Sequence, residues 1–324
     1  MENTKFFEKP QEGQPWDVAI IGSGPSAFSA AVYSTRGAAS TLILGGANWG
    51  GQLMLTTDVD NYPGFPEGIQ GPELVAKMRA QAERFDAEFK AEDVVSVDFS
   101  SNPFKLKTDA GEYSANAVII GTGAGTHWLG VPGEEKLRGR GVSSCAPCDA
   151  PFFKEKRVVV VGGGDSAMEE ALVLTKYATS VTIIHRRDAF RASQAMQQKV
   201  LANKKINVIW NSEVTEFVGG DKLEKVIVKD KDGKAAELPA EGAFVAIGHV
   251  PATEIFKGQV ELDEKGYVKR YEKDGYKMAT SKEGVFVAGD VHDFHYRQAV
   301  TAAGFGCMAG MEALKHLDKE PPNY

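Results

Sequence analysis

The stretch that decides the fold is Asp17-Val18-Ala19-Ile20-Ile21-Gly22-Ser23-Gly24-Pro25-Ser26-Ala27. Its apolar first half predicts a short buried strand, and the glycine-rich half leads into a helix expected over Phe28–Arg36. Gly22 and Gly24 let the backbone turn tightly and approach a pyrophosphate, whose charge is favoured at a helix N-terminus. A second apolar strand at Thr41–Leu44 completes a βαβ unit. We therefore predict a dinucleotide-binding unit.

The same pattern recurs 140 residues later without a gap. The matched positions are Gly22, Gly24, Ser26, Ala27, Ala31, Thr35, Ser40 and Ile43 with Gly162, Gly164, Ser166, Ala167, Ala171, Thr175, Ser180 and Ile183. Two copies of one nucleotide-binding unit imply two dinucleotide sites. The predicted fold class is therefore α/β with two Rossmann-like dinucleotide-binding domains.

The two copies differ at the end of their second strand, where nucleotide selectivity is set. The first copy has Gly45-Gly46-Ala47, and the second has His185-Arg186-Arg187 followed by Arg191. An acid here would accept hydrogen bonds from a ribose hydroxyl, whereas arginines suit a 2′-phosphate. A solvated basic cluster is the alternative. We predict NADPH at the second site, preferred over NADH by about two to four orders of magnitude, because charged hydrogen bonds contribute roughly 1.5–3 kcal/mol each.

A different chemistry is indicated by Ser144-Cys145-Ala146-Pro147-Cys148-Asp149. Two cysteines at this spacing can close a small disulfide, and one thiol is commonly acidified toward the thiolate that attacks another disulfide. Asp149 could exchange a proton with the departing sulfur. Half of a zinc site is the alternative, but it needs two further ligands, and Cys307 has no histidine at ligand spacing. We predict thiol–disulfide exchange, and we interpret Cys307 as a small buried hydrophobe.

Other patterns complete the organisation of the chain. Helical spacing extends over Gly71–Phe89, and the segment 121–125, Gly-Thr-Gly-Ala-Gly, marks a domain boundary. Strands are predicted at 94–99, 104–108, 117–120, 157–161, 207–210, 214–218 and 223–229, with a turn at Asp232-Gly233 and a return crossing over 242–251.

The C-terminal segment carries one further strong pattern. The buried strand Gly284–Asp290 ends in an acid, and a helix of small residues starts within Tyr296–Val300. That helix start could present its amides to an electron-rich ligand ring. Asp290 could bind a ribityl or phosphate-linked hydroxyl, and a solvated acid at a strand end is the alternative.

Composition restricts the class of partner. The chain has 324 residues, 43% of them hydrophobic and 25% charged, and a net charge of -7. It is therefore a poor electrostatic match for nucleic acid or an anionic membrane. Three cysteines are too few for a secreted disulfide framework, and no apolar run reaches membrane-spanning length. Residues 1–16 are polar, so we expect no signal peptide and a cytoplasmic location.

These pieces together resemble the low-molecular-weight, bacterial-type thioredoxin reductases. The motifs that match are GSGPSA at 22–27, GGQL at 50–53, DNYPGFPEGI at 60–69, GTGA at 121–124, RGRGVSSCAPCD at 138–149, GGGDSAMEEA at 162–171, HRRDAFRA at 185–192, GVFVAGDV at 284–291 and YRQAVTAAGFGCMA at 296–309. The resemblance implies an FAD domain made from residues 1–125 and 251–324, an inserted NADPH domain over 126–250 that carries the cysteine pair, and a homodimer.

The resemblance also implies a relay from NADPH through FAD and the Cys145–Cys148 disulfide to a thioredoxin-like protein. It makes Cys148 the flavin-facing sulfur, Cys145 the sulfur that attacks the protein substrate, and Asp149 the acid. The implied FAD-binding residues are Gly22, Gly24, Pro25, Ser26, Ala27, Gly51, Gln52, Leu53, Asn61, Val95, Thr122, Gly123, Gly289, Asp290, Arg297, Gln298 and Ala299. The NADPH-binding residues are Gly162, Gly164, Asp165, Ser166, Ala167, His185, Arg186, Arg187 and Arg191. The family rotates its NADPH domain between half-reactions, here about residues 125–129 and 248–251.

The chain departs from the family pattern inside the segment 145–151, which we call the redox loop. Most members have Thr or Val at the position of Pro147, Gly at Ala150 and an aromatic residue at Pro151. Proline fixes φ and removes an amide N–H, which can alter thiolate stabilisation and redox poise. Three other functions fit parts of the sequence: a reductase for a different small redox protein, a ferredoxin-linked relative, and a redox sensor without turnover. The arginines at 186, 187 and 191 count against the ferredoxin-linked relative.

Overall fold

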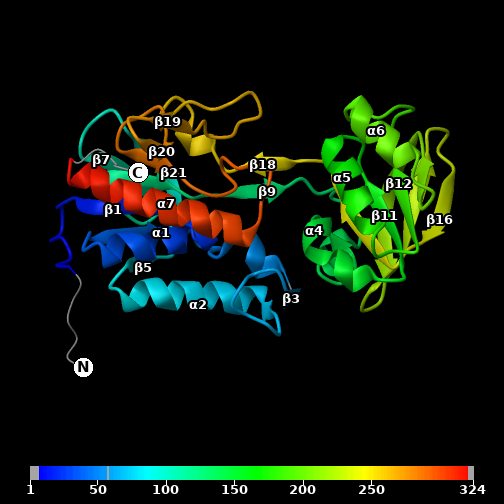
Figure 1. The fold of residues 1–324 in the computed structure, drawn as a ribbon, viewed down its shortest axis with the longest axis horizontal. Helices are drawn as coiled ribbons and strands as arrows, with labels where there is room; N and C mark the ends of the chain where they lie inside the picture. The colour runs from blue at the N-terminus through cyan, green and yellow to red at the C-terminus, as the bar shows by residue number, and fades with distance from the viewer. Residues whose placement is uncertain (1–6, 57, 320–324) are drawn as a thin grey trace. The chain divides into compact units, whose positions relative to one another are not determined.

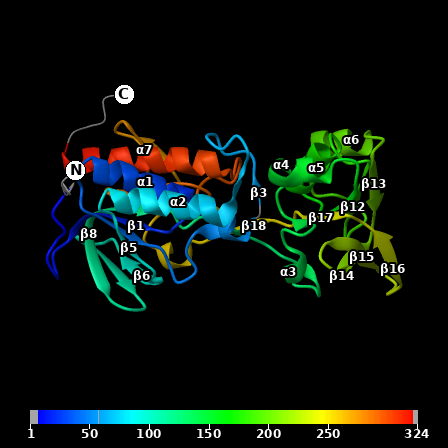
Figure 2. The same ribbon diagram turned by 90° about the horizontal axis from the view of Figure 1, so that it is seen from below.

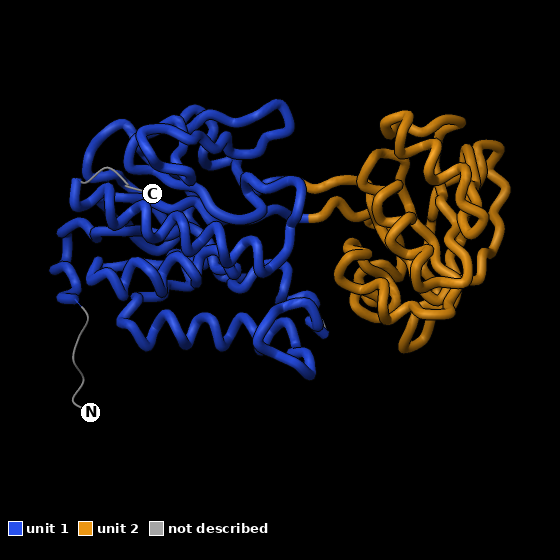
Figure 3. The backbone as a smooth tube through the Cα atoms, in the orientation of Figure 1, with its two compact units in different colours: residues 1–125, 250–324 blue, residues 126–249 orange. Residues whose placement is uncertain are grey.

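The computed structural model describes residues 7–56 and 58–319. The chain divides into two compact units (Figure 3). The first unit runs up to Gly125 and resumes at Val250, and the second is the continuous stretch Thr126–His249. The start of the stretch considered for a signal peptide, residues 1–6, lies outside the described residues. Within 7–56 and 58–319, no helix has the length and apolar character to cross a membrane.

The first unit is built on a nine-stranded sheet with a parallel centre (Figure 1). Its parallel strands are β21 (Val285–Val287), β8 (Glu112–Ile120), β1 (Trp16–Ile21), β2 (Thr41–Leu44) and β5 (Glu88–Lys90), in that spatial order. The strands β19 (Tyr271–Lys273), β20 (Tyr276–Ala279), β6 (Val94–Asp98) and β7 (Phe104–Thr108) add to it antiparallel. Ile20 pairs with Ile43 on one side and Ile119 on the other. Strands β1 and β2 are apolar along most of their length because both faces of the sheet are covered there.

Three helices of the first unit lie side by side: α1 (Pro25–Arg36), α2 (Gly71–Arg84) and α7 (Ala299–Leu317) (Figure 1, Figure 2). Their buried residues share one hydrophobic core with β1 and β8. The α1 and α7 backbones approach closely because α7 has glycine at the contact. A Cβ atom added to Gly306 would lie 2.0 Å from the carbonyl oxygen of Ser26. Only glycine fits there, so this packing depends on the absence of a side chain.

The predicted helix over Gly71–Phe89 was too long. Helix α2 ends at Arg84, and Asp86 takes a φ of 68°, which turns the chain away from the helix axis. Phe89 instead lies in β5, which pairs with β2. There its ring packs against Phe28 and Trp49. The sheet edge and this aromatic cluster therefore outweigh the helical spacing of the sequence.

The second unit repeats the parallel βαβ pattern, as predicted. Its five-stranded parallel sheet has the order β10 (Val142–Ser143), β17 (Gly242–Val245), β11 (Arg157–Val161), β12 (Ser180–Ile184) and β13 (Ile206–Ile209). Helices α5 (Asp165–Leu174) and α6 (Gln194–Leu201) join these strands. An antiparallel sheet of β14 (Ser212–Gly219), β15 (Leu223–Asp230) and β16 (Ala235–Pro239) completes the unit, with the predicted turn at Asp232-Gly233. Two parallel-sheet units of this kind confirm the α/β fold class.

The two crossings between the units run as paired strands. Strands β9 (Ala124–Thr126) and β18 (His249–Pro251) form a two-stranded sheet. Beside them, the amide of Ala252 donates to the carbonyl of Gly123 at 3.0 Å. The shorter elements are η1 (Gly51–Leu55), β3 (Asp58–Val59), β4 (Ile69–Gln70), α3 (Glu134–Leu137), α4 (Ala146–Asp149), η2 (Ala150–Phe153) and η3 (Glu254–Phe256).

Candidate active site

Cys145 and Cys148 are joined in a disulfide, with their Cα atoms 5.3 Å apart. Cys145 is the N-cap of the four-residue helix α4, and the short helix η2 follows directly. In this state both sulfurs are bonded to each other and are not thiolate ligands for a metal. The predicted disulfide is therefore formed on a short helical segment of the second unit.

Asp149 lies beside this disulfide and is linked to it through Ser143. The Ser143 hydroxyl donates to Oδ2 of Asp149 at 2.5 Å and accepts the amide of Cys145 at 3.1 Å. Burial raises the pKa of the Asp149 carboxyl, against the opposing effect of the Ser143 hydrogen bond. A carboxyl that keeps its proton to higher pH suits the role of an acid. Ser143 itself was not predicted, because nothing in its sequence pattern distinguishes it from other loop serines.

A second carboxyl reaches the redox loop from α5. Glu170 is 8% exposed, and its Oε2 accepts a hydrogen bond from the amide of Ala146, the residue after Cys145. No sequence pattern predicted this contact either, because Glu170 follows the redox loop by more than twenty residues and resembles any other acidic residue on a helix.

The two unusual prolines occupy positions where their missing amide costs little. Pro147 lies in the first turn of α4 and Pro151 in the first turn of η2. The first turn of a helix leaves its N–H groups without intrahelical partners, so proline is tolerated there. Both prolines are exposed. The departure from the family pattern is thus compatible with the local backbone.

The first dinucleotide motif has the geometry that its glycines predict. Gly22 has a φ of 126°, and a Cβ atom on it would lie 2.2 Å from the carbonyl oxygen of Gly121. Gly24 is the N-cap of α1, and the space around its Cα is open. Pro25, Ser26 and Ala27 form the first turn, which contains no acidic residue. The positive end of α1 is therefore open to an anionic group.

Four of the other predicted FAD-binding residues follow the carboxyl ends of parallel strands. Thr122 and Gly123 come after β8, and Gly289 and Asp290 after β21. Gly51, Gln52 and Leu53 lie in η1. Val95 lies on β6 and is half exposed. Ligands of open α/β sheets bind at the carboxyl ends of the strands, so the topology gathers these four residues at the same edge as the first dinucleotide motif.

Asp290 provides the clearest sign of a ligand at this edge. Its Oδ1 atom is buried and has no hydrogen-bond partner among the described residues. Burial raises the pKa of Asp290 to about 7, with a contribution from Asp293 and an opposing one from Arg297. Buried polar atoms are nearly always hydrogen-bonded, so we expect a ligand to donate a hydrogen bond to this oxygen. A ribityl hydroxyl of FAD has the required chemistry, and the residues present fit the cofactor.

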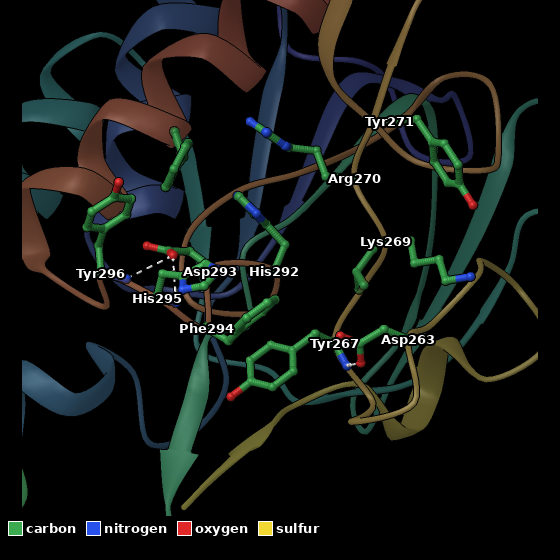
Figure 4. Close-up of a pocket in the computed structure, with 12 residues that line it drawn as sticks. Asp263, Tyr267, Lys269, Arg270, Tyr271, His292, Asp293, Phe294, His295 and Tyr296 are labelled. Atoms are coloured by element: carbon green, nitrogen blue, oxygen red, sulfur yellow. Dashed lines mark hydrogen bonds between the residues drawn. The ribbon is translucent and has the colours of Figure 1, made fainter. Parts of the chain in front are cut away.

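The loop after Asp290 is held by Asp293 (Figure 4). Its carboxylate accepts the amides of His295 and Tyr296 at 3.0 Å each and that of Arg297 at 3.2 Å. Gln298 then caps α7 in a reciprocal capping box with Thr301. The Gln298 Oε1 atom also accepts the Asn61 side-chain amide at 3.1 Å. Two distant predicted residues, Asn61 and Gln298, are thereby brought together.

A cavity of about 390 Å³ opens beside the same loop (Figure 4). Its charged groups are engaged within the chain: Arg270 lies 3.7 Å from Glu272, Lys269 lies 3.6 Å from Glu261, and Asp263 accepts the amide of Tyr267. Burial and the nearby Arg270 lower the pKa of His292 to about 4, so this imidazole is neutral at physiological pH. The rings of Tyr267 and Phe294 pack with their centroids 5.6 Å apart, so this wall of the cavity supports the loop that follows Asp290.

The second dinucleotide motif repeats the geometry of the first. A Cβ atom on Gly162 would lie 2.4 Å from the carbonyl oxygen of Ala246, and Gly164 is the N-cap of α5. Ser166 and Ala167 follow in the first turn. Asp165 accepts the amide and hydroxyl of Ser193 at 2.9 and 2.8 Å. This bond ties the start of α5 to the loop after β12, where the arginines lie.

His185 and the three arginines have different environments. His185 is buried, its Nε2 lies 3.0 Å from the carbonyl oxygen of Ala189, and burial lowers its pKa, with the arginines adding to the effect. Arg186, Arg187 and Arg191 are exposed, and none forms a salt bridge with another described residue. His185 therefore supports the loop, while the guanidinium groups are available to an anionic ligand.

Cys307 is only half-buried, so the expectation of a buried position was wrong. The buried residues of α7 are Ala302, Gly306, Ala309, Gly310, Glu312 and Ala313, and Cys307 follows Gly306 in the chain without being fully buried itself. Its sulfur is 3.9 Å from the Met311 sulfur. A hydrogen bond to the thiol raises the pKa of Tyr33.

Comparison with known proteins identifies the class to which this fold and disulfide belong. Residues 16–306 match the family described as Pyridine nucleotide-disulphide oxidoreductase. The chain therefore belongs to that family, and its redox-active centre is the Cys145–Cys148 disulfide.

Relatives define the position of the chain within the family. A thioredoxin reductase of Streptomyces clavuligerus is 51% identical over 93% of this chain and 94% of its own length. That of Rickettsia conorii is 51% identical over 93% and 98%. The solved thioredoxin reductase from Giardia duodenalis has a TM-score of 0.89 at 43% identity, covering 94% of this chain and 100% of its own. Within the family the chain thus groups with the bacterial-type thioredoxin reductases, which confirms the resemblance found in the sequence.

Proposed function

We propose that this enzyme passes electrons from NADPH through FAD to the Cys145–Cys148 disulfide and from there to thioredoxin. The observation that carries the proposal is the disulfide itself, which lies beside the half-buried acid Asp149 in a chain with two dinucleotide motifs. The names of the similar proteins support thioredoxin as the acceptor. The reaction would take place in the cytoplasm, in a homodimer.

The residues of the first unit would hold FAD. The open N-terminus of α1 would bind the pyrophosphate, and Asp290 would accept a hydrogen bond from a ribityl hydroxyl. The start of α7, after Gln298, would present its amides to the ring system. When bound, FAD supplies a two-electron link between a hydride donor and a disulfide. The full set of proposed FAD contacts is the one inferred above from the family resemblance.

The residues of the second unit would bind NADPH and handle the thiols. The N-terminus of α5 would receive the pyrophosphate, and Arg186, Arg187 and Arg191 the 2′-phosphate. Breaking the disulfide consumes two electrons and leaves two thiols once two protons are added. Asp149 would supply a proton to the departing sulfur. The family order assigns Cys148 to the flavin side and Cys145 to the attack on the protein substrate.

The direct test is NADPH oxidation with a panel of candidate acceptors. We expect rapid NADPH consumption with a bacterial thioredoxin and much slower consumption with a glutaredoxin. With reduced ferredoxin as electron donor in place of NADPH, we expect no reduction of thioredoxin. Cys148→Ser should abolish thioredoxin reduction. Turnover with glutaredoxin but not thioredoxin would reassign the acceptor, and no turnover with any carrier would favour the redox sensor.

The nucleotide assignment has its own test in the loop after β12. Replacing Arg186 and Arg187 by alanine should raise the KM for NADPH at least tenfold, since each charged hydrogen bond contributes roughly 1.5–3 kcal/mol. The KM for NADH should hardly change, because NADH lacks the 2′-phosphate. Replacing the exposed Lys204 by alanine serves as the matched loss of positive charge. Unchanged NADPH kinetics in the double variant would remove both arginines from the phosphate site.

A further inference from the structure

Each backbone N–H group around the Cys145–Cys148 disulfide can be followed to its hydrogen-bond acceptor. Helix α4 spans only four residues, so individual N–H groups matter more there than a helix dipole. The amide of Cys145 donates to the Ser143 hydroxyl, and those of Cys148 and Asp149 donate to the carbonyl of Cys145. Pro147 has no N–H to donate. The remaining amide of the segment is that of Ala146.

The amide of Ala146 is taken by Glu170 from helix α5. Amide donors of this kind commonly acidify a cysteine in the Cys-x-x-Cys arrangement. Here the amide directly after Cys145 instead points to a carboxyl group. The hydrogen bond also joins α5, which begins at the second dinucleotide motif, to the segment that carries the disulfide.

The surroundings of this hydrogen bond are apolar. Ala146 is fully buried, and it shares a hydrophobic cluster with Ala167, Ala171 and Phe244. Charge interactions are stronger in such surroundings than in water, because little solvent screens them. A carboxylate at this place opposes the formation of a thiolate nearby, since the two negative charges repel.

We propose that Glu170 is a positioning residue that sets the thiol acidity and reduction potential of the Cys145–Cys148 pair. It does so in two ways: it withholds the Ala146 amide from sulfur, and it adds a negative charge beside the pair. Both effects destabilise the thiolate and thereby favour the disulfide, which makes the dithiol a stronger reductant. The proposal rests on the redox role of the pair described above and does not depend on which protein accepts the electrons.

Three single variants of the FAD-loaded enzyme separate these effects. Glu170→Gln keeps an acceptor for the amide and removes the charge, and Glu170→Ala removes both. The neighbouring Glu169 is exposed, so Glu169→Gln is a matched loss of one acid from the same helix. Each protein is equilibrated in dithiothreitol buffers of graded redox ratio, then trapped by alkylation. Peptide mass spectrometry reads Cys145 and Cys148 separately from Cys307.

The pH dependence distinguishes the proposal from a merely structural role. Above the ordinary thiol pKa of ~8.5, Glu170→Gln should shift the equilibrium toward dithiol by about tenfold, or about 30 mV. Well below that pH both thiols stay protonated, so the shift should disappear. Alkylation of reduced Cys145 or Cys148 near neutral pH should also become about tenfold faster. Glu169→Gln should change neither quantity.

Two outcomes would overturn the proposal. One is an equilibrium and alkylation rate in Glu170→Gln that match those of the parent enzyme at every pH. The other is an equal shift at high and low pH, which would indicate altered packing and would accompany a lower melting temperature. Failure of the parent pair to exchange with dithiothreitol at all would instead contradict the proposed function, so the two failures can be told apart.

Discussion

Asp290 shows how one residue can oppose the stability of a fold and still be useful to it. Its Oδ1 atom is buried and has no hydrogen-bond partner among the described residues. Burial raises its pKa to about 7, well above the ordinary range of an aspartate. The folded chain therefore holds a proton on Asp290 at pH values where the unfolded chain has lost it. The contribution of this proton to the free energy of unfolding is fully present below pH ~4 and is lost as the pH rises through ~7.

We expect Asp290→Asn to change the pH dependence of the FAD-free protein. The variant cannot ionise at this position, so its free energy of unfolding relative to the parent should rise between pH ~4 and ~7. The gain is at most ~4 kcal/mol, because each pKa unit is worth about 1.4 kcal/mol. Urea unfolding across this pH range measures it. The control Asp274→Asn, at an exposed turn, should follow the parent curve.

The same substitution should weaken FAD binding. The carboxylate of Asp290 is the proposed acceptor for a ribityl hydroxyl, and charged hydrogen bonds contribute roughly 1.5–3 kcal/mol. Asp290→Asn should therefore release FAD at least about tenfold more readily, as measured by flavin fluorescence after dilution. Unaltered FAD retention would show that Asp290 faces some other group.

Among the secondary-structure elements, the contact between α1 and α7 is the one most sensitive to a single side chain. Gly306 lies against the backbone of Ser26, and backbone atoms cannot move aside as a flexible side chain can. Gly304 lies on the same helix with no atom within 4 Å of an added Cβ. These two glycines differ in surroundings but not in helix, so they form a matched pair.

Alanine at these two positions should change stability in opposite directions. Gly306→Ala should cost roughly 1–3 kcal/mol, because it forces the two helices apart. Gly304→Ala should add about 0.5–1 kcal/mol, because alanine is the better helix former and meets no obstacle. Urea unfolding of the FAD-loaded protein gives both values. Destabilisation of similar size by both substitutions would mean that the helix contact is looser than described.

Strand and helix patterns were predictable where burial alone decides them. The strands β1 and β11 and the glycine turns after them follow from apolar runs and spacing. The end of α2 was not predictable, because the helical spacing of apolar residues continues to Phe89, whereas Phe89 lies in the edge strand β5. The contacts of Ser143 and Glu170 with the redox loop were not predictable either. They depend on side chains that approach only after folding, so no local pattern announces them.

At the scale of the whole molecule, the two units have separate hydrophobic cores. Among residues 7–56 and 58–319, each buried hydrophobic cluster lies within one unit, and none combines residues from both. The second unit is also continuous in sequence, from Thr126 to His249. A continuous stretch of chain with its own hydrophobic core can in principle fold independently.

The fragment 126–249 should accordingly fold when expressed alone. We expect a cooperative thermal transition, an intact Cys145–Cys148 disulfide and NADPH binding within about threefold of the full chain, a difference of under ~0.7 kcal/mol. FAD binding should be lost, because its proposed residues lie in the other unit. Calorimetry with NADPH and with FAD tests both statements. An unfolded fragment would mean that the second unit needs the first for its stability.

The paired crossings β9 and β18 have a consequence for how such a gene can be rearranged. Gly123 and Ala252 are joined by a backbone hydrogen bond, so the chain leaves and re-enters the first unit at a single point. A turn of two or three residues could therefore replace everything between them and leave the surrounding sheet uncut. Conversely, a foreign segment whose ends lie equally close could be spliced into the same place. The junction is thus a natural site for building chimaeras that exchange the redox module while keeping the flavin scaffold.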